Sequence, residues 1–277
     1  VTREIRNSAG WRWVIAAVLV ALAIAMVHGP TALENFSTIH WEDERFYDHV
    51  ARNVDTWQAC LVKPLWPGLF RPLTTTCYYY LVDQLVGSSL LVRVQVHHII
   101  NLLLYFSNGL LLLALASQFT RWPYALGAAL LFVTRRAHAE IVLNSVEFQA
   151  LAALFFSLLC LFWFVRARQR NQPALWGAAC VALLIALLCK EPAAMTPAML
   201  VAYGLLYDRR AAWRWYAAPV GIALVWVLLF VILFRRFSGY APTGFHYTFA
   251  PEQWLSHYRV YLLSFANHWV HGPADWI

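Results

Sequence analysis

Long apolar runs separated by short polar segments dominate the chain. The runs cover residues 11–27, 90–116, 123–133, 146–165, 173–189, 193–207 and 215–234. A helix needs about 20 apolar residues to cross a hydrocarbon core about 30 Å thick, and these runs reach or approach that length. The pattern predicts an all-α polytopic membrane protein with about seven transmembrane helices.

The first polar segment contains two stretches that predict helices on the membrane surface. Residues 48–57 have apolar positions at helical spacing, and residues 71–87 carry three Thr, three Tyr, an Asp and a Gln. The second stretch is too polar for a span, and its tyrosines are typical of headgroup level. If residues 71–87 crossed the membrane, the Arg-rich loop at 166–170 would lie outside, against the positive-inside rule.

The polar segments divide the chain into two parts. Residues 1–237 form the predicted transmembrane domain, with a first outer loop at 29–89. Residues 238–277 form a C-terminal segment on the same face, with a helix predicted over 251–270. Aromatic residues follow one side of that helix and histidines another, so we interpret it as interfacial, with a metal or pigment site as the alternative.

Composition supports the membrane class and excludes others. The chain of 277 residues is 61% hydrophobic and only 13% charged, with a mean hydropathy of +0.55. Its net charge of +7 comes mostly from Arg residues in short loops between apolar runs, which indicates membrane orientation and no nucleic-acid partner. The five cysteines lack metal-ligand spacing, so neither a disulfide framework nor a zinc site is indicated.

The loop charges predict the orientation. Arg3, Arg6 and Arg12 lie at or before the first span, and no small-residue cleavage site follows it, so we expect a retained first helix with a cytoplasmic N-terminus. The expected location is the inner membrane of a bacterium, in contact with membrane lipids and with the C-terminus outside. Three polar groups then share the outer face. They are Glu42 with Asp43, His138 with Glu140, and Lys190 with Glu191.

This convergence of charges indicates a site. Carboxylates at a membrane edge can act as a general base or hold a divalent cation against a phosphate. Cations on the same face can neutralise a phosphate leaving group. These cations include Arg71, Arg135, Arg136 and Lys190. The alternatives are solvated loop charges for the acids, headgroup anchors for the paired arginines, and a local ion pair at a helix end for Lys190 and Glu191.

A polar stripe follows one predicted span. His97, Asn101, Tyr105 and Asn108 are spaced by four, four and three residues, which places them on one helix face. Polar groups at membrane depth need partners, so the stripe faces other helices, a lipid-linked substrate or a partner subunit. Helix packing is the first of these three interpretations.

A series of motifs resembles the GT-C superfamily of membrane glycosyltransferases, and most closely the TMTC-type O-mannosyltransferases. Protein O-mannosyltransferases and lipid A aminoarabinose transferases are more distantly similar. The motifs are, in order, the acidic pair in the first loop, Phe70-Arg71-Pro72-Leu73, His98-Ile99-Ile100-Asn101 with the three leucines that follow, the segment 132–142, and Leu188-Cys189-Lys190-Glu191-Pro192.

The resemblance implies a lipid-phosphate-linked sugar as donor and an inverting transfer. It places the base at Asp43 with Glu42 beside it, and a second acid at Glu140 with His138. The phosphate partners it implies are Arg71 and Lys190, with Glu191 adjacent in the same motif. A displacement with inversion needs a base opposite the departing phosphate, which agrees with this assignment.

The chain departs from the family pattern at two places. The Gly-Arg that usually follows the second acid is replaced by Val146-Glu147-Phe148-Gln149, and relatives continue beyond residue 277 through further spans. We therefore expect a minimal enzyme, a fragment, or a relative that kept the fold without the reaction. A non-catalytic subunit of a larger membrane complex is the alternative to the glycosyltransferase. A transporter is a third hypothesis, against which stands the lack of an internal repeat.

Overall fold

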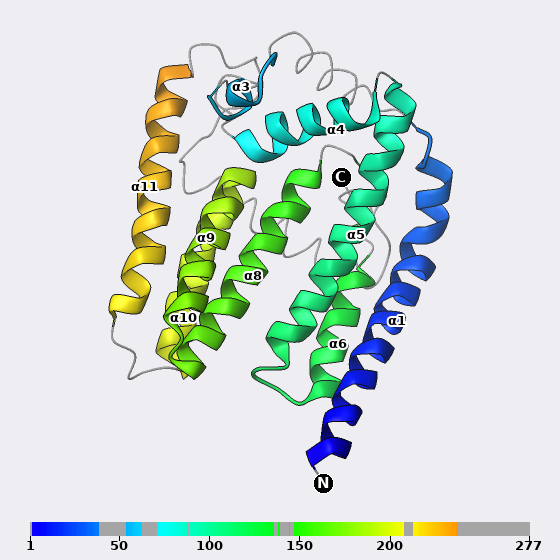
Figure 1. Ribbon diagram of the computed structural model, residues 1–277, viewed down its shortest axis with the longest axis vertical. Coiled ribbons are helices and arrows are strands. Elements are labelled where there is room, and N and C mark those ends of the chain that lie inside the picture. The colour runs from blue at the N-terminus through cyan, green and yellow to red at the C-terminus, as the bar shows by residue number, and fades with distance from the viewer. Residues whose placement is uncertain are drawn as a thin grey trace, which may run out of the picture.

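The structure, a computed structural model, describes residues 2–38, 54–62, 71–87, 89–135, 138, 144, 147–207 and 213–237. Every regular element within these residues is a helix. Seven helices run side by side along the long direction of the molecule (Figure 1). They are α1 (Thr2–Asn35), α5 (Leu90–Ala116), α6 (Trp122–Val133), α8 (Phe148–Arg170), α9 (Pro173–Cys189), α10 (Thr196–Tyr207) and α11 (Arg214–Phe237).

Four of these helices are long and apolar enough to cross a membrane. The candidate spans are Gly10–Asn35, Leu90–Ala116, Phe148–Arg170 and Arg214–Ile232. The helices α6 and α9 are apolar but shorter, with 12 and 17 residues. The chain is therefore an all-helical integral membrane protein over the described residues, with four candidate spans where the sequence predicts about seven.

Tight connections make neighbouring helices antiparallel. Residues 117–121 join α5 to α6, and Asn171 with Gln172 joins α8 to α9. Asn171 adopts the left-handed conformation (φ 51°), and the amide of Gln172 donates to the carbonyl of Ala167 at 3.0 Å. This C-terminal cap ends α8 with an asparagine in the position that glycine usually takes. Both connections lie at the end of the bundle where the chain begins, called here the N-terminal end (Figure 1).

Three further helical elements cover the opposite end of the bundle. They are α3 (Trp57–Val62), the π-helical turn η1 (Pro72–Cys77) and α4 (Tyr78–Val86). α4 lies across the helix ends instead of beside them, so this end is called the α4 end (Figure 1). The helix predicted over 48–57 is wrong in its described part: residues 54–56 are not helical, and α3 begins at Trp57. Thr56 accounts for the start of α3 at Trp57, because its Oγ1 accepts from the amide of Ala59 as a helix cap.

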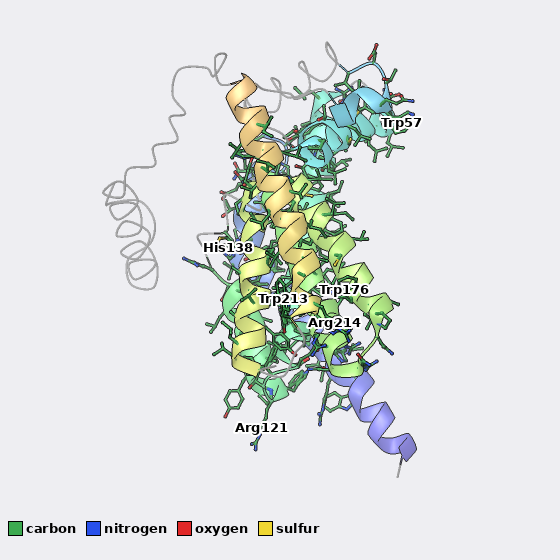
Figure 2. All side chains as sticks on the ribbon, turned by 90° about the vertical axis from the view of Figure 1, so that its left-hand side faces the viewer. Trp57, Arg121, His138, Trp176, Trp213 and Arg214 are labelled. Carbon is green, nitrogen blue, oxygen red and sulfur yellow. The ribbon has the colours of Figure 1, made fainter. Side chains whose placement is uncertain are left out.

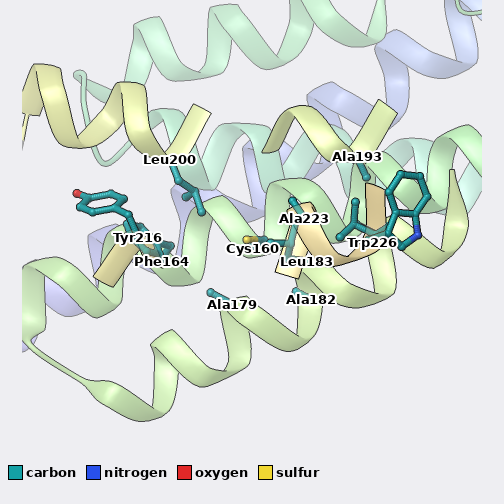
Figure 3. Close-up of a cluster of buried hydrophobic side chains, with 12 residues drawn as sticks. Cys160, Phe164, Ala179, Ala182, Leu183, Ala193, Leu200, Tyr216, Ala223 and Trp226 are labelled. Atoms are coloured by element: carbon teal, nitrogen blue, oxygen red, sulfur yellow. The ribbon is translucent and has the colours of Figure 1, made fainter. Parts of the chain in front are cut away.

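The largest apolar cluster among the described residues joins four helices, α8, α9, α10 and α11, as Figure 3 shows. Small residues of α9, Ala179, Ala182 and Ala186, are buried in it and let the neighbouring helix backbones approach closely. Phe164 and Trp226 fill the space on either side. A smaller cluster of Ala152, Ala153 and Cys189 joins the start of α8 to the end of α9, and the charged residues of the next subsection lie at those ends.

The polar stripe of α5 is buried against neighbouring helices, which confirms the helix-packing interpretation. Its four side chains are at most 1% exposed. Nδ2 of Asn101 donates to the carbonyl of Asn144 at 3.0 Å, and Nδ2 of Asn108 donates to the carbonyl of Leu151 at 3.1 Å. The first acceptor lies a few residues before α8, and the second lies in its first turn.

Candidate functional site

Arg71 and Glu191 form a two-pronged ion pair at the α4 end. Nε of Arg71 donates to Oε1 of Glu191 at 2.8 Å, and Nη2 of Arg71 donates to Oε2 at 2.7 Å. Nη1 of Arg71 also donates to Oε1 of Gln149 at 2.5 Å. One side chain thus joins η1 to η4 (Glu191–Met195) and to the first turn of α8. The two side chains of the ion pair are only 16% and 20% exposed, so the pair is well shielded from water.

Lys190 forms a second ion pair beside the first. Its Nζ donates to Oε2 of Glu147 at 2.8 Å, and the two side chains are 21% and 33% exposed. Glu147 precedes α8, and Lys190 follows α9. Arg71, Glu147, Gln149, Lys190 and Glu191 are called here the charged cluster.

Packing around η1 and α4 fixes the position of Arg71. Oγ1 of Thr74 donates to the carbonyl of Cys189 at 2.7 Å, which satisfies one of the free carbonyls at the end of α9. The ring of Tyr78 stacks on Phe148 with centroids 3.6 Å apart, and its hydroxyl bonds to Nδ1 of His97 at 2.5 Å. The segment that carries Arg71 is thereby held against α5, α8 and α9 together.

The charged cluster is electrically neutral, because two cations face two carboxylates. The bonds to Glu191 and Gln149 use three of the five N–H groups of Arg71. One hydrogen on each terminal nitrogen therefore stays available for a ligand oxygen. A phosphate could bind there without displacing Glu191, but it would meet a cation whose charge is already compensated.

A second polar group surrounds the end of α6. An α-helix of 12 residues is about 18 Å long and one of 27 residues is about 40 Å long, so α6 ends part-way along α5. Nε2 of His28 donates to the carbonyl of Val133, and the hydroxyl of Tyr105 donates to the carbonyl of Phe132, both at 3.0 Å. These bonds satisfy carbonyls that the early end of α6 leaves without helical partners.

His138 completes this second group. Its Nδ1 lies 2.9 Å from the hydroxyl of Tyr105, whose single proton goes to the Phe132 carbonyl, so Nδ1–H of His138 is the donor to Tyr105. Burial, reinforced by the positive charge of Arg135 and by His28, lowers the pKa of His138 to about 4. A general base works best with a pKa near the working pH, so this histidine is better suited to positioning the chain than to taking a proton.

The structure brings some of the predicted site residues together and separates others. Arg71, Lys190 and Glu191 lie in the charged cluster, whereas His138 and Arg135 belong to the group at the end of α6. The remaining predicted residues lie outside the described part of the chain. They are Glu42, Asp43, Arg136 and Glu140.

Sequence reasoning did not assign Glu147 and Gln149 to the site, although both stand where the family pattern is broken. Glu147 forms an ion pair with Lys190, and Gln149 accepts a hydrogen bond from Arg71. Comparison of the chain with models of protein families, with curated protein sequences and with solved structures gave no match.

Proposed function

We propose that the protein is a membrane glycosyltransferase of the GT-C type that takes a sugar from a lipid-phosphate donor at the α4 end. The observation that supports this proposal is the charged cluster. Arg71 and Glu191 are 120 residues apart in the chain, yet they meet beside the first loop. That loop carries Glu42 and Asp43 in the sequence. Two of the motifs that resemble the family, those that contain Arg71 and Glu191, thus meet at one place in the fold.

The distribution of charge supports an outer position for this end. The described side chains at the N-terminal end include six arginines and no carboxylate. The arginines are Arg12, Arg121, Arg166, Arg168, Arg170 and Arg214. Arg121 and Arg214 mark that end in Figure 2. The described carboxylates lie at the α4 end. The positive-inside rule places the N-terminal end in the cytoplasm, with about seven spans and α4 on the outer membrane surface.

Each group has a role in the proposed transfer. The two remaining N–H groups of Arg71, together with Lys190, bind the donor phosphate and stabilise the charge that develops as the bond to the sugar breaks. Asp43 takes the proton of the acceptor hydroxyl while that oxygen attacks the sugar from the opposite face. Glu191 and Gln149 hold the Arg71 guanidinium in one orientation, which makes the phosphate site ready before the donor arrives.

Transfer from defined donors tests this proposal. The purified chain in lipid nanodiscs is mixed with a panel of polyprenyl-phosphate sugars, and release of the polyprenyl phosphate is measured. Asp43→Asn should reduce turnover by at least 100-fold without changing the thermal midpoint, because only the base is removed. Asp55→Asn is the matched control, since Asp55 is an exposed carboxylate of the same loop. Equal turnover by both variants would remove Asp43 as the base.

The neutrality of the charged cluster supports a second function, a non-catalytic subunit of a larger membrane complex. A catalytic phosphate site gains from uncompensated positive charge, whereas Arg71 and Lys190 each face a carboxylate. Glu147 stands where the family pattern has Gly-Arg, so a cation is replaced by an anion. In this alternative the ion pairs hold helices together and bind no donor.

The mass of the particle extracted from the native membrane in mild detergent separates the two functions. A particle that contains this chain alone, or two copies of it, supports the enzyme. A larger particle with other proteins in fixed stoichiometry, combined with no turnover of any donor, supports the structural subunit.

A further inference from the structure

Two cysteines meet at the α4 end, on different elements. Cys60 lies in α3 and Cys77 ends η1. The two elements pack together, and both cysteines belong to one apolar cluster with Tyr79 and Val82. Cys60 is 1% exposed and Cys77 is half-buried.

The two thiols lie in the same part of this cluster. The thiol of Cys60 donates to the carbonyl of Thr56, with 3.6 Å between Sγ and the oxygen. Each thiol also shifts the pKa of the other, which indicates that the two side chains lie near each other. The two cysteines are therefore neighbours across the contact between α3 and η1.

We propose that Cys60 and Cys77 form an intramolecular disulfide that ties α3 to the end of η1. The bond closes a loop of the chain that contains Arg71, whose ion pair with Glu191 belongs to the candidate site. The disulfide holds the two ends of that loop at a fixed separation. The proposed outer position of the α4 end is an oxidising environment, in which such a bond persists.

The bond forms by two exchange steps with a small disulfide as oxidant. The half-exposed Cys77 attacks one sulfur of oxidised glutathione as the thiolate, releases one glutathione, and carries the other as a mixed disulfide. The Cys60 sulfur then displaces the second glutathione. The two cysteines together lose two protons and two electrons, and oxidised glutathione becomes two molecules of reduced glutathione.

The folded chain forms this bond slowly. Burial raises the pKa of the Cys60 thiol, and burial together with the neighbouring Cys60 raises the pKa of Cys77 to about 12. Few thiolates exist at neutral pH under these conditions. The same burial protects the disulfide from reduction once it has formed.

A thiol count on the full chain tests the proposal. The reduced protein in mild detergent is incubated with oxidised glutathione at pH 8.5, then denatured and alkylated with N-ethylmaleimide without reduction. Intact mass spectrometry counts the adducts, and peptide mapping identifies the linkage. The reduced chain should take five adducts, one for each cysteine, and the oxidised chain three. The two cysteines that take no adduct should appear as two peptides linked by a disulfide between Cys60 and Cys77.

Two variants provide matched controls. Cys180→Ser removes a cysteine of α9 and should leave the Cys60–Cys77 linkage unchanged. Cys60→Ser should abolish the linkage and leave Cys77 either free or as a glutathione adduct. Five adducts after oxidation of the natural chain, glutathione adducts alone, or a linkage to another cysteine would each overturn the proposal. The thiol count is independent of sugar transfer, so the two proposals fail separately.

Discussion

The guanidinium of Arg71 and the carboxylate of Glu191 are joined by parallel hydrogen bonds of 2.8 and 2.7 Å. The planar fork of arginine matches the two carboxylate oxygens, which fixes the orientation of both groups. Because Arg71 precedes η1 and Glu191 begins η4, the pair connects the first loop to the turn between α9 and α10. The cluster is therefore part of the packing of the fold as well as the candidate donor site.

Loss of either partner should destabilise the protein. Arg71→Gln or Glu191→Gln leaves one half-buried charge without its partner, and we expect each to cost about 1–3 kcal/mol of unfolding free energy. The double variant should cost less than the sum, with a coupling of about 0.5–3 kcal/mol. Reversible unfolding in detergent, followed by tryptophan fluorescence, measures all three. Arg121→Gln, at an exposed residue, should change stability by less than about 0.5 kcal/mol. Additive effects of the two single variants would contradict a direct pair.

A close helix contact at Gly109 gives a second prediction. A Cβ added at this position would lie 2.8 Å from Cγ1 of Val133 and 3.2 Å from Cγ1 of Val20. Gly109→Ala should therefore destabilise the contact of α5 with α1 and α6 by about 1–3 kcal/mol. Adding Val133→Ala should restore part of this loss, because it removes the closest methyl group.

Gly127→Ala is the matched control for Gly109→Ala. Among the described residues, no atom outside the neighbouring backbone of its own helix, α6, lies within 4 Å of a Cβ added at Gly127. Alanine is the better helix former, so this variant should be neutral or stabilising by up to about 1 kcal/mol. If both glycine variants had the same effect, the contact of Gly109 with Val133 would not limit stability. Unfolding midpoints under one set of conditions compare them.

Protonation of His138 should oppose folding as the pH falls. Its pKa is about 4 in the folded protein, below the ordinary value of 6.5, so the unfolded chain takes up the proton first. The stability that neutral His138 contributes is complete above pH 6.5, declines between pH 6.5 and 4, and falls no further below that. Thermal unfolding between pH 4 and 8 measures the decline. His138→Asn keeps an N–H donor that does not titrate, so its unfolding temperature should change less with pH between 4 and 6.5. An equal dependence on pH in the variant and the natural chain would show that His138 does not cause the decline.

The proposed orientation predicts opposite labelling at the two ends of the bundle. Leu85 on α4 is 75% exposed, and Thr120 between α5 and α6 is exposed at the N-terminal end. In a background without other cysteines, Leu85→Cys should react with a membrane-impermeant maleimide in intact cells. Thr120→Cys should react only after the membrane is permeabilised. The reverse pattern would place the charged cluster in the cytoplasm and contradict an outer-face transfer.

Local patterns were sufficient to predict the helices and the polar face of α5. Apolar runs and their polar boundaries predicted α5, α6, α9 and α11 closely, because a membrane requires every backbone group to be bonded within the segment, whereas α1 extends well beyond its predicted run at both ends. The polar stripe on α5 was predicted to face other helices, because burying it in lipid would leave His97 and Asn101 without partners. The helix predicted over 48–57 was wrong over residues 54–56, where Thr56 caps the start of α3.

The tertiary structure alone determines which residues from different helices become partners. Nothing in the sequence pairs Arg71 with Glu191 or Cys60 with Cys77, since each member of a pair lies on a different element. The early end of α6 is likewise supported by His28 and Tyr105 from two other helices. Apolar periodicity reports which residues avoid water, and by itself it predicts where the apolar helices lie. The partner of each buried polar group depends on how the helices pack, and only the folded chain determines that packing.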